Sequence, residues 1–132
     1  MKFYLDTSIW LDLTEKRGCH GEIAKQLIGK IILENHTIIC SDYVIIELSR
    51  LGYSQNDIYA AFSIVRNNTK RVHMNNNQVT EAKKIAKNRN VPYGDALHAV
   101  ISRDNEAQFI TRDEDFLKLK DITKAQRPED LL

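Results

Sequence analysis

Short apolar runs alternate along the chain with longer segments whose apolar residues recur at helical spacing. Residues 3–5 and the β-branched stretch 37–40 have the length and composition of buried strands. Residues 109–111 show the same pattern, 71–74 are a weaker strand candidate, and 122–125 are a candidate final edge strand. The pattern therefore predicts four or five short strands.

Helical spacing is clearest over residues 22–34, where Ala24, Leu27, Ile28 and Ile31 fall on one face. Gly18 and Gly21 are expected to bracket a break before this helix. A short helical turn is expected at 9–13, and a helix capped by Ser41 or Asp42 at 42–51. A further helix starts with a capping pattern at Ser54 and fades at Asn67. The remaining expected helices lie around 79–86, 95–102 and 116–120.

Strands that alternate with helices in this way predict a mostly parallel sheet covered on both faces. We therefore expect a three-layer α/β/α fold in which a central sheet of four or five short strands forms one domain over residues 1–132. At 132 residues the chain is long enough to bury a core without disulfides or structural metals.

The composition limits the classes of protein that this chain can belong to. The charged fraction of 28% and the hydrophobic fraction of 42% are ordinary for a soluble globular protein and argue against disorder. A net charge of +1 excludes a broad polybasic surface, so any nucleic-acid partner must meet a local patch. Two isolated cysteines, no signal peptide and no long apolar stretch predict a cytoplasmic location without membrane contact.

Four carboxylates occupy comparable places relative to the expected elements. Asp6 closes the first strand, Asp113 closes the strand at 109–111, Glu47 lies in the helix after the second strand, and Asp95 begins a later helix. Because the carboxyl ends of parallel strands line one edge of the sheet, all four can converge there. Each also has a purely structural alternative, since the aspartates suit helix caps and Glu47 suits an ion pair with Arg50.

Carboxylates that converge repel one another unless a cation lies between them. Hard oxygen ligands without a matching set of histidines or cysteines favour Mg²⁺ or Mn²⁺ over zinc. We therefore predict that Asp6, Glu47, Asp95 and Asp113 bind a divalent ion, with Asp115 as a further candidate ligand. Such an ion can activate water for attack on a phosphodiester.

Other polar and aromatic residues flank these acids. The hydroxyls of Thr7, Ser8 and Thr111 are candidates to position water or a substrate phosphate, although local turn hydrogen bonds are the commoner role of such residues. Tyr93 is a candidate for stacking on a base. Arg112 suits either a buried carboxylate or a substrate phosphate.

One histidine also accompanies the acids. His98 lies one helical turn after Asp95 and faces roughly the same way, but a single histidine on an apolar helix is more commonly a packed residue than a general base. We therefore do not include it among the predicted site residues.

Four segments resemble, in order and spacing, the motifs of PIN-domain ribonucleases. They are Leu5-Asp6-Thr7-Ser8, the helix that carries Glu47, Gly94-Asp95-Ala96-Leu97-His98-Ala99 and Ile110-Thr111-Arg112-Asp113-Glu114-Asp115-Phe116. The resemblance covers essentially the whole chain. It implies a Mg²⁺- or Mn²⁺-dependent endoribonuclease in which Asp6, Glu47, Asp95 and Asp113 match the family's acids, and Ser8 and Thr111 match its hydroxyl positions.

A free-standing domain of this length is similar to the toxin subunit of VapBC toxin-antitoxin pairs. That similarity implies a homodimer, an RNA substrate and an antitoxin protein that inhibits the toxin. A housekeeping RNA-processing nuclease and a non-catalytic RNA- or protein-binding module remain the alternatives. Aspartyl phosphoryl transfer fits less well, because its D-x-D-x-T pattern would need an acid where Ser8 stands. A topoisomerase-primase site would need Glu in place of Asp6.

Overall fold

The five strands pair side by side in one sheet, and every pairing is parallel. The computed structural model describes residues 1–16 and 18–132. Within the sheet the order is β3-β2-β1-β4-β5, so the first strand of the chain is the central one. The strands are β1 (Lys2–Leu5), β2 (Thr37–Ser41), β3 (Thr69–Val72), β4 (Gln108–Ile110) and β5 (Ala125–Gln126). This confirms the predicted parallel α/β class.

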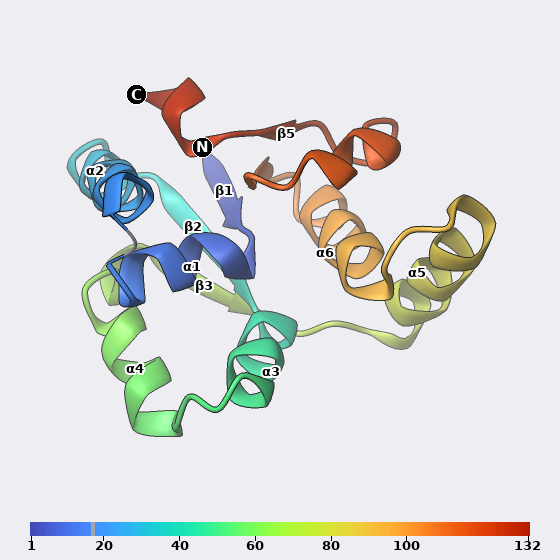
Figure 1. The fold of residues 1–132 in the computed structure, drawn as a ribbon, viewed down its shortest axis with the longest axis horizontal. Helices are drawn as coiled ribbons and strands as arrows, with labels where there is room; N and C mark the ends of the chain where they lie inside the picture. The colour runs from blue at the N-terminus through green and yellow to red at the C-terminus, as the bar shows by residue number, and fades with distance from the viewer. Residues whose placement is uncertain (17) are drawn as a thin grey trace.

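Helices cover both faces of the sheet, as Figure 1 shows, with α1, α2 and α4 on one side and α5 and α6 on the other. The α-helices are α1 (Thr7–Thr14), α2 (Gly18–Leu33), α3 (Asp42–Arg50), α4 (Gln55–Ser63), α5 (Asn76–Arg89) and α6 (Tyr93–Asp104). Three 3-10 segments complete the described elements: η1 (Arg66–Asn68), η2 (Glu114–Leu119) and η3 (Pro128–Leu131). The α3 helix and the start of α6 both lie toward the carboxyl ends of the strands (Figure 1).

Side-chain caps explain where several helices begin. The Ser41 hydroxyl accepts from the Val44 amide at the start of α3, and Ser54 forms a reciprocal capping box with Asp57 at the start of α4. Asn75 forms the same arrangement with Gln78 before α5. These caps match the predicted starts at Ser41 and Ser54.

Two predictions near the first helices differ from the structure. The short helical turn expected at 9–13 is helical, but it belongs to a longer element, the eight-residue helix α1. Gly18 and Gly21 do not bracket a break, because α2 begins at Gly18 and continues through Gly21. Gly21 is buried where α2 approaches α1, and a Cβ atom there would lie 2.8 Å from the Asp12 carbonyl oxygen. This glycine therefore permits close helix packing.

Two strand boundaries also differ from the predicted ones. The third strand covers Thr69–Val72 rather than 71–74, and the last covers Ala125–Gln126 rather than 122–125. Both are edge strands, and the third exposes Lys70 and Arg71, so neither has the apolar pattern that marks a buried strand.

The core lies on both sides of β1. Tyr4 and Phe109 stack on neighbouring strands with ring centroids 5.5 Å apart, and Leu97 of α6 is fully buried. On the opposite face Trp10 packs against Phe62 at 4.2 Å. None of the helices in the described residues is both long enough and apolar enough to span a membrane.

Candidate metal centre

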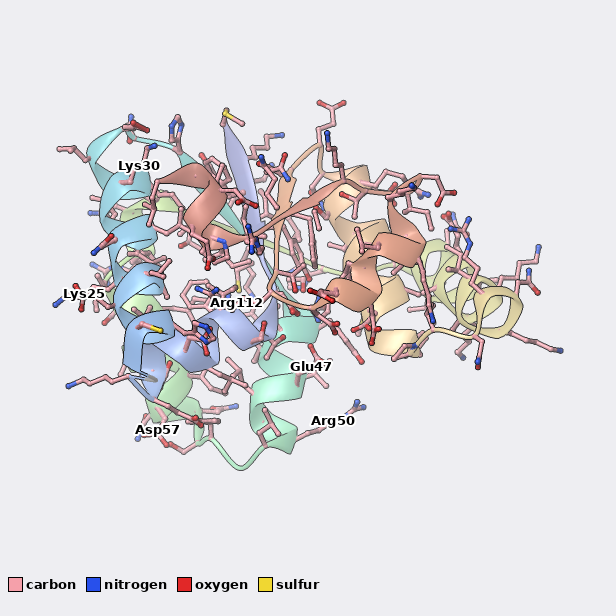
Figure 2. All side chains as sticks on the ribbon, turned by 45° about the horizontal axis from the view of Figure 1, so that its top comes forward. Lys25, Lys30, Glu47, Arg50, Asp57 and Arg112 are labelled. Carbon is pink, nitrogen blue, oxygen red and sulfur yellow. The ribbon has the colours of Figure 1, made fainter. Side chains whose placement is uncertain are left out.

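The predicted acids lie at one edge of the sheet, where the strands end. Asp6 joins β1 to α1, and Asp113 follows β4, which pairs directly with β1. Glu47 comes from α3, and Asp95 lies in the first turn of α6. Figure 2 shows Glu47 on α3, on the side that faces the start of α6, whereas Arg50 of the same helix extends outward.

Asp6 is held through one of its two carboxylate oxygens. Its Oδ2 atom accepts hydrogen bonds from the Ser8 hydroxyl and the Thr111 hydroxyl, each at 2.9 Å. Although Asp6 is the N-cap residue of α1, its side chain makes no capping hydrogen bond. Among the described residues, no hydrogen bond reaches Oδ1. The capping alternative therefore does not account for Asp6, which is only 9% exposed.

Glu47 is held in the same one-sided way. Its Oε1 atom accepts from the Thr7 hydroxyl at 2.6 Å and from His98 Nε2 at 2.5 Å, so His98 rather than Arg50 is its close partner. Its Oε2 atom faces the backbone of Gly94, where a Cβ atom would stand 3.4 Å away. Burial raises the pKa of Glu47, but hydrogen bonds from His98 and Thr7, together with electrostatic interactions with His98 and Arg50, lower the net pKa.

Asp95, Asp113 and Asp115 form a second group of acids. Each offers a carboxylate oxygen, and these atoms all lie within 4.8 Å of one another. Burial and the negative charges of Asp113 and Asp6 raise the pKa of Asp95 to about 6. Asp113 also caps η2, since its Oδ1 accepts from the Asp115 amide at 2.9 Å.

Contacts and charge link the two groups of acids into one site. His98 Nε2, which bonds Glu47, lies 3.9 Å from Asp6 Oδ1. The charge of Asp6 in turn contributes to the raised pKa of Asp95. Segments that are more than a hundred positions apart in sequence therefore meet, as the predicted convergence requires.

The donor atoms of this site fit a hard divalent cation. Most of its donor atoms are carboxylate oxygens. The nearby hydroxyls of Thr7, Ser8 and Thr111 donate hydrogen bonds to these carboxylates. The nitrogen of His98 that faces the site is occupied by Glu47. Oxygen-rich sites of this kind suit Mg²⁺ or Mn²⁺ rather than zinc.

Two further predicted residues flank the acids. Tyr93 begins α6, is partly buried and contacts the Tyr43 ring edge-on at 6.1 Å. Arg112 binds both oxygens of Glu129 at 2.7 and 2.8 Å, and its Nε lies 3.4 Å from buried Asp12. Of its two expected roles, the structure places Arg112 against carboxylates.

Three residues outside the predicted set also shape the site. His98 is 1% exposed, and its Nδ1 atom lies 2.5 Å from the hydroxyl of Tyr4, which lies 2.7 Å from the hydroxyl of Ser41. Two positions in the sequence could have indicated them: Tyr4 lies in β1, two residues before Asp6, and His98 follows Asp95 by nearly one helical turn. Nothing local in the sequence marks Ser41 beyond its capping role.

Taken together, fold and site define a parallel α/β protein with a carboxylate centre at the carboxyl edge of its sheet. A family model described as "PIN domain" matches residues 3–122. The chain therefore belongs to the PIN-domain family, which confirms the resemblance. No curated protein matches the sequence significantly.

Solved structures share this fold over nearly the full chain. VapBC2 from Rickettsia felis, bound to a DNA fragment from its promoter, matches with a TM-score of 0.72 and 16% identity, covering 96% of this chain and 98% of that one. VapBC-1 from nontypeable Haemophilus influenzae gives 0.68 and 17%, covering 98% and 99%. PAE2754 from Pyrobaculum aerophilum gives 0.62 and 18%, covering 99% and 86%. At these identities the similarity shows the fold.

Proposed function

We propose that this protein is a divalent-metal-dependent endoribonuclease that hydrolyses RNA phosphodiester bonds. The observation that carries the proposal is the convergence of Asp6, Glu47, Asp95, Asp113 and Asp115 at one edge of the sheet. Carboxylates that repel one another destabilise the folded chain unless a cation binds between them, so their convergence indicates a function. Membership of the PIN family, whose members are nucleases, supports the same reaction.

In this proposal five carboxylates are the ligands of the metal ion. Asp6 and Glu47 would bind the ion through the oxygens that accept no hydrogen bond among the described residues, Oδ1 and Oε2, and Asp95, Asp113 and Asp115 would complete the ligand set. A bound Mg²⁺ or Mn²⁺ would lower the pKa of a water and neutralise charge on the phosphoryl oxygens.

The residues around the acids have supporting roles. Ser8 and Thr111 hold Asp6, and Thr7 holds Glu47, which orients these carboxylates. The hydrogen bond from Thr7 also helps to lower the pKa of Glu47. Tyr93 lies beside Asp95 at the start of α6, where its ring can stack on a base of the substrate. Arg112, which directly precedes Asp113, pairs with Asp12 and Glu129, and these ion pairs hold the backbone beside Asp113 in place.

The first test replaces the central carboxylate. We expect Asp6→Asn to remove cleavage of an end-labelled single-stranded RNA in Mn²⁺, because the amide offers no negative charge to the ion, and to leave the circular dichroism spectrum unchanged. Asp121→Asn is the matched control, since Asp121 is an exposed aspartate that pairs with Arg89 outside the site. Cleavage by Asp6→Asn at the rate of the unchanged protein would contradict the proposal.

We further propose that the protein is a homodimeric toxin that an antitoxin protein inhibits. The full-length structural similarity to VapBC complexes supports this role. If the proposal is correct, expression in a bacterial host arrests growth, Asp6→Asn relieves the arrest, and a small protein encoded directly upstream neutralises it. A processing nuclease would instead cleave RNA in vitro without arresting growth, and a binding module would do neither.

A further inference from the structure

A chain of buried hydrogen bonds runs from the backbone of α3 to the carboxylate of Glu47. The Val44 amide meets the Ser41 hydroxyl at 3.3 Å, which meets the Tyr4 hydroxyl at 2.7 Å. The Tyr4 hydroxyl meets His98 Nδ1 at 2.5 Å, and His98 Nε2 meets Glu47 Oε1 at the same distance. Ser41, Tyr4 and His98 are each at most 1% exposed, so water does not compete for these bonds.

The two ends of this chain restrict the directions of its hydrogen bonds. An amide can only donate, so the Ser41 oxygen accepts from Val44. At the other end the ionised Glu47 can only accept, so His98 Nε2 carries a proton. When the imidazole is neutral, this leaves Nδ1 as an acceptor for the Tyr4 hydroxyl, and the Tyr4 oxygen can then accept from the Ser41 hydroxyl. In that state each hydroxyl and ring donor of the chain has one acceptor.

Building on the proposed function, we propose that His98 is a positioning residue that orients Glu47 toward the metal ion. Thr7 and His98 both occupy Oε1, which leaves Oε2 as the oxygen that can serve as a ligand. Oε2 lies against the start of α6, where a Cβ atom at Gly94 would stand 3.4 Å from it. Tyr4 and Ser41 act through His98 by holding its ring and its tautomer, as the outer partners of metal ligands do.

The experiment measures Mn²⁺ affinity by electron paramagnetic resonance of free Mn²⁺ in titrations of the full-length protein. We expect His98→Leu to weaken Mn²⁺ binding by about tenfold or more, the usual effect of losing such a partner. His98→Gln should recover most of the affinity, because its amide N–H can donate to Glu47 in place of Nε2. Tyr4→Phe removes only a hydroxyl and should cause a smaller loss than His98→Leu.

Ser102→Ala provides the matched control. Ser102 is also buried on α6, but its hydroxyl bonds the Ala107 carbonyl outside the site. The control should keep full Mn²⁺ affinity, which separates a loss of orientation from a general loss of stability. Should His98→Leu fail to fold, the comparison of Tyr4→Phe with Ser102→Ala tests the same chain.

The outcomes distinguish this proposal from the proposed function. Equal Mn²⁺ affinity in His98→Leu and the unchanged protein would overturn the positioning role while leaving metal binding intact. An equal loss in His98→Gln and His98→Leu would also overturn it, because donation to Glu47 would then be irrelevant. If the unchanged protein neither binds Mn²⁺ nor cleaves RNA, the metal centre itself, and this role with it, is wrong.

Discussion

Asp95 shows most directly that the site strains the protein. Its pKa of about 6 results first from burial and then from the charges of Asp113 and Asp6. A carboxyl group whose pKa rises from 3.8 to about 6 on folding binds its proton more tightly in the folded chain. Its effect on stability is therefore unfavourable above pH 6 and fades as the pH falls from 6 toward 3.8.

Neutralising this residue should stabilise the metal-free protein. We expect Asp95→Asn to add on the order of 1 kcal/mol at pH 7.5, less than the roughly 3 kcal/mol of a fully buried group because solvent screens a half-exposed carboxyl. In EDTA this corresponds to a rise in Tm of about 3–5 °C at pH 7.5, and the difference should shrink toward pH 4. A gain in stability that is equal at both values of pH would show that charge is not the cause.

At the scale of elements, the crossing of α1 and α2 depends on one missing side chain. The three atoms nearest to a Cβ atom at Gly21 would all be backbone atoms, the Asp12 carbonyl oxygen at 2.8 Å and Lys16 atoms at 3.0 and 3.1 Å. Backbone cannot rotate aside as a side chain can. Because α1 begins directly after Asp6, the packing of α2 against α1 also bears on the site.

Alanine at two glycines of the same helix should therefore have opposite effects. We expect Gly21→Ala to destabilise the protein by about 1–3 kcal/mol through overpacking. Gly29→Ala, where nothing lies within 4 Å of the added carbon, should stabilise it by about 0.5–1 kcal/mol through helix propensity. Urea unfolding of both variants measures the difference, and a destabilising Gly29→Ala would contradict this explanation.

The sequence predicts elements well where burial imposes a period and poorly where it does not. The strands at 37 and 109 and the capped helix that begins after Ser41 are found within a residue or two of the expected bounds. The helix after Ser54 begins where predicted but ends at Ser63, before the predicted end at Asn67. The edge strand β3 exposes its central residues, so its position follows from pairing with β2, which the local sequence does not encode. Gly21 was predicted to mark a break, but it lies inside α2 because of its contact with α1, which the local sequence does not encode either.

In the site, too, features of single segments could be predicted, whereas contacts between distant segments could not. Acids at strand ends can be recognised one segment at a time, because parallel strands bring their carboxyl ends to one edge. The partnership of Glu47 with His98 joins α3 to α6, and only the packed molecule reveals it. A lone histidine on an apolar helix gives no sign of what its ring meets.

At the scale of the molecule, folding concentrates negative charge that the sequence spreads out. The net charge of the chain is only +1, yet five carboxylates meet at one edge of the sheet. Anything that binds this cluster in the folded chain alone stabilises folding by mass action. Divalent ions should therefore stabilise this protein more than monovalent salt does.

We expect millimolar Mn²⁺ to raise the Tm of the unchanged protein by several degrees, since saturation a hundredfold above Kd contributes about 2.7 kcal/mol. Asp95→Asn should lose most of that shift, although it starts from the higher Tm in EDTA. Differential scanning fluorimetry with Na⁺ at equal ionic strength is the control. Equal shifts in Mn²⁺ and Na⁺ would indicate screening instead of a defined centre.

The strand order β3-β2-β1-β4-β5 has a consequence for the newly made protein. β1 pairs with β4, and Asp6 accepts a hydrogen bond from Thr111, so both interactions need residues that are made about a hundred positions later. A ribosome partway through translation has released Asp6 and Glu47 while Asp95 and Asp113 are still unmade. Under the proposed function, the metal centre therefore cannot be completed until synthesis of the chain is nearly finished.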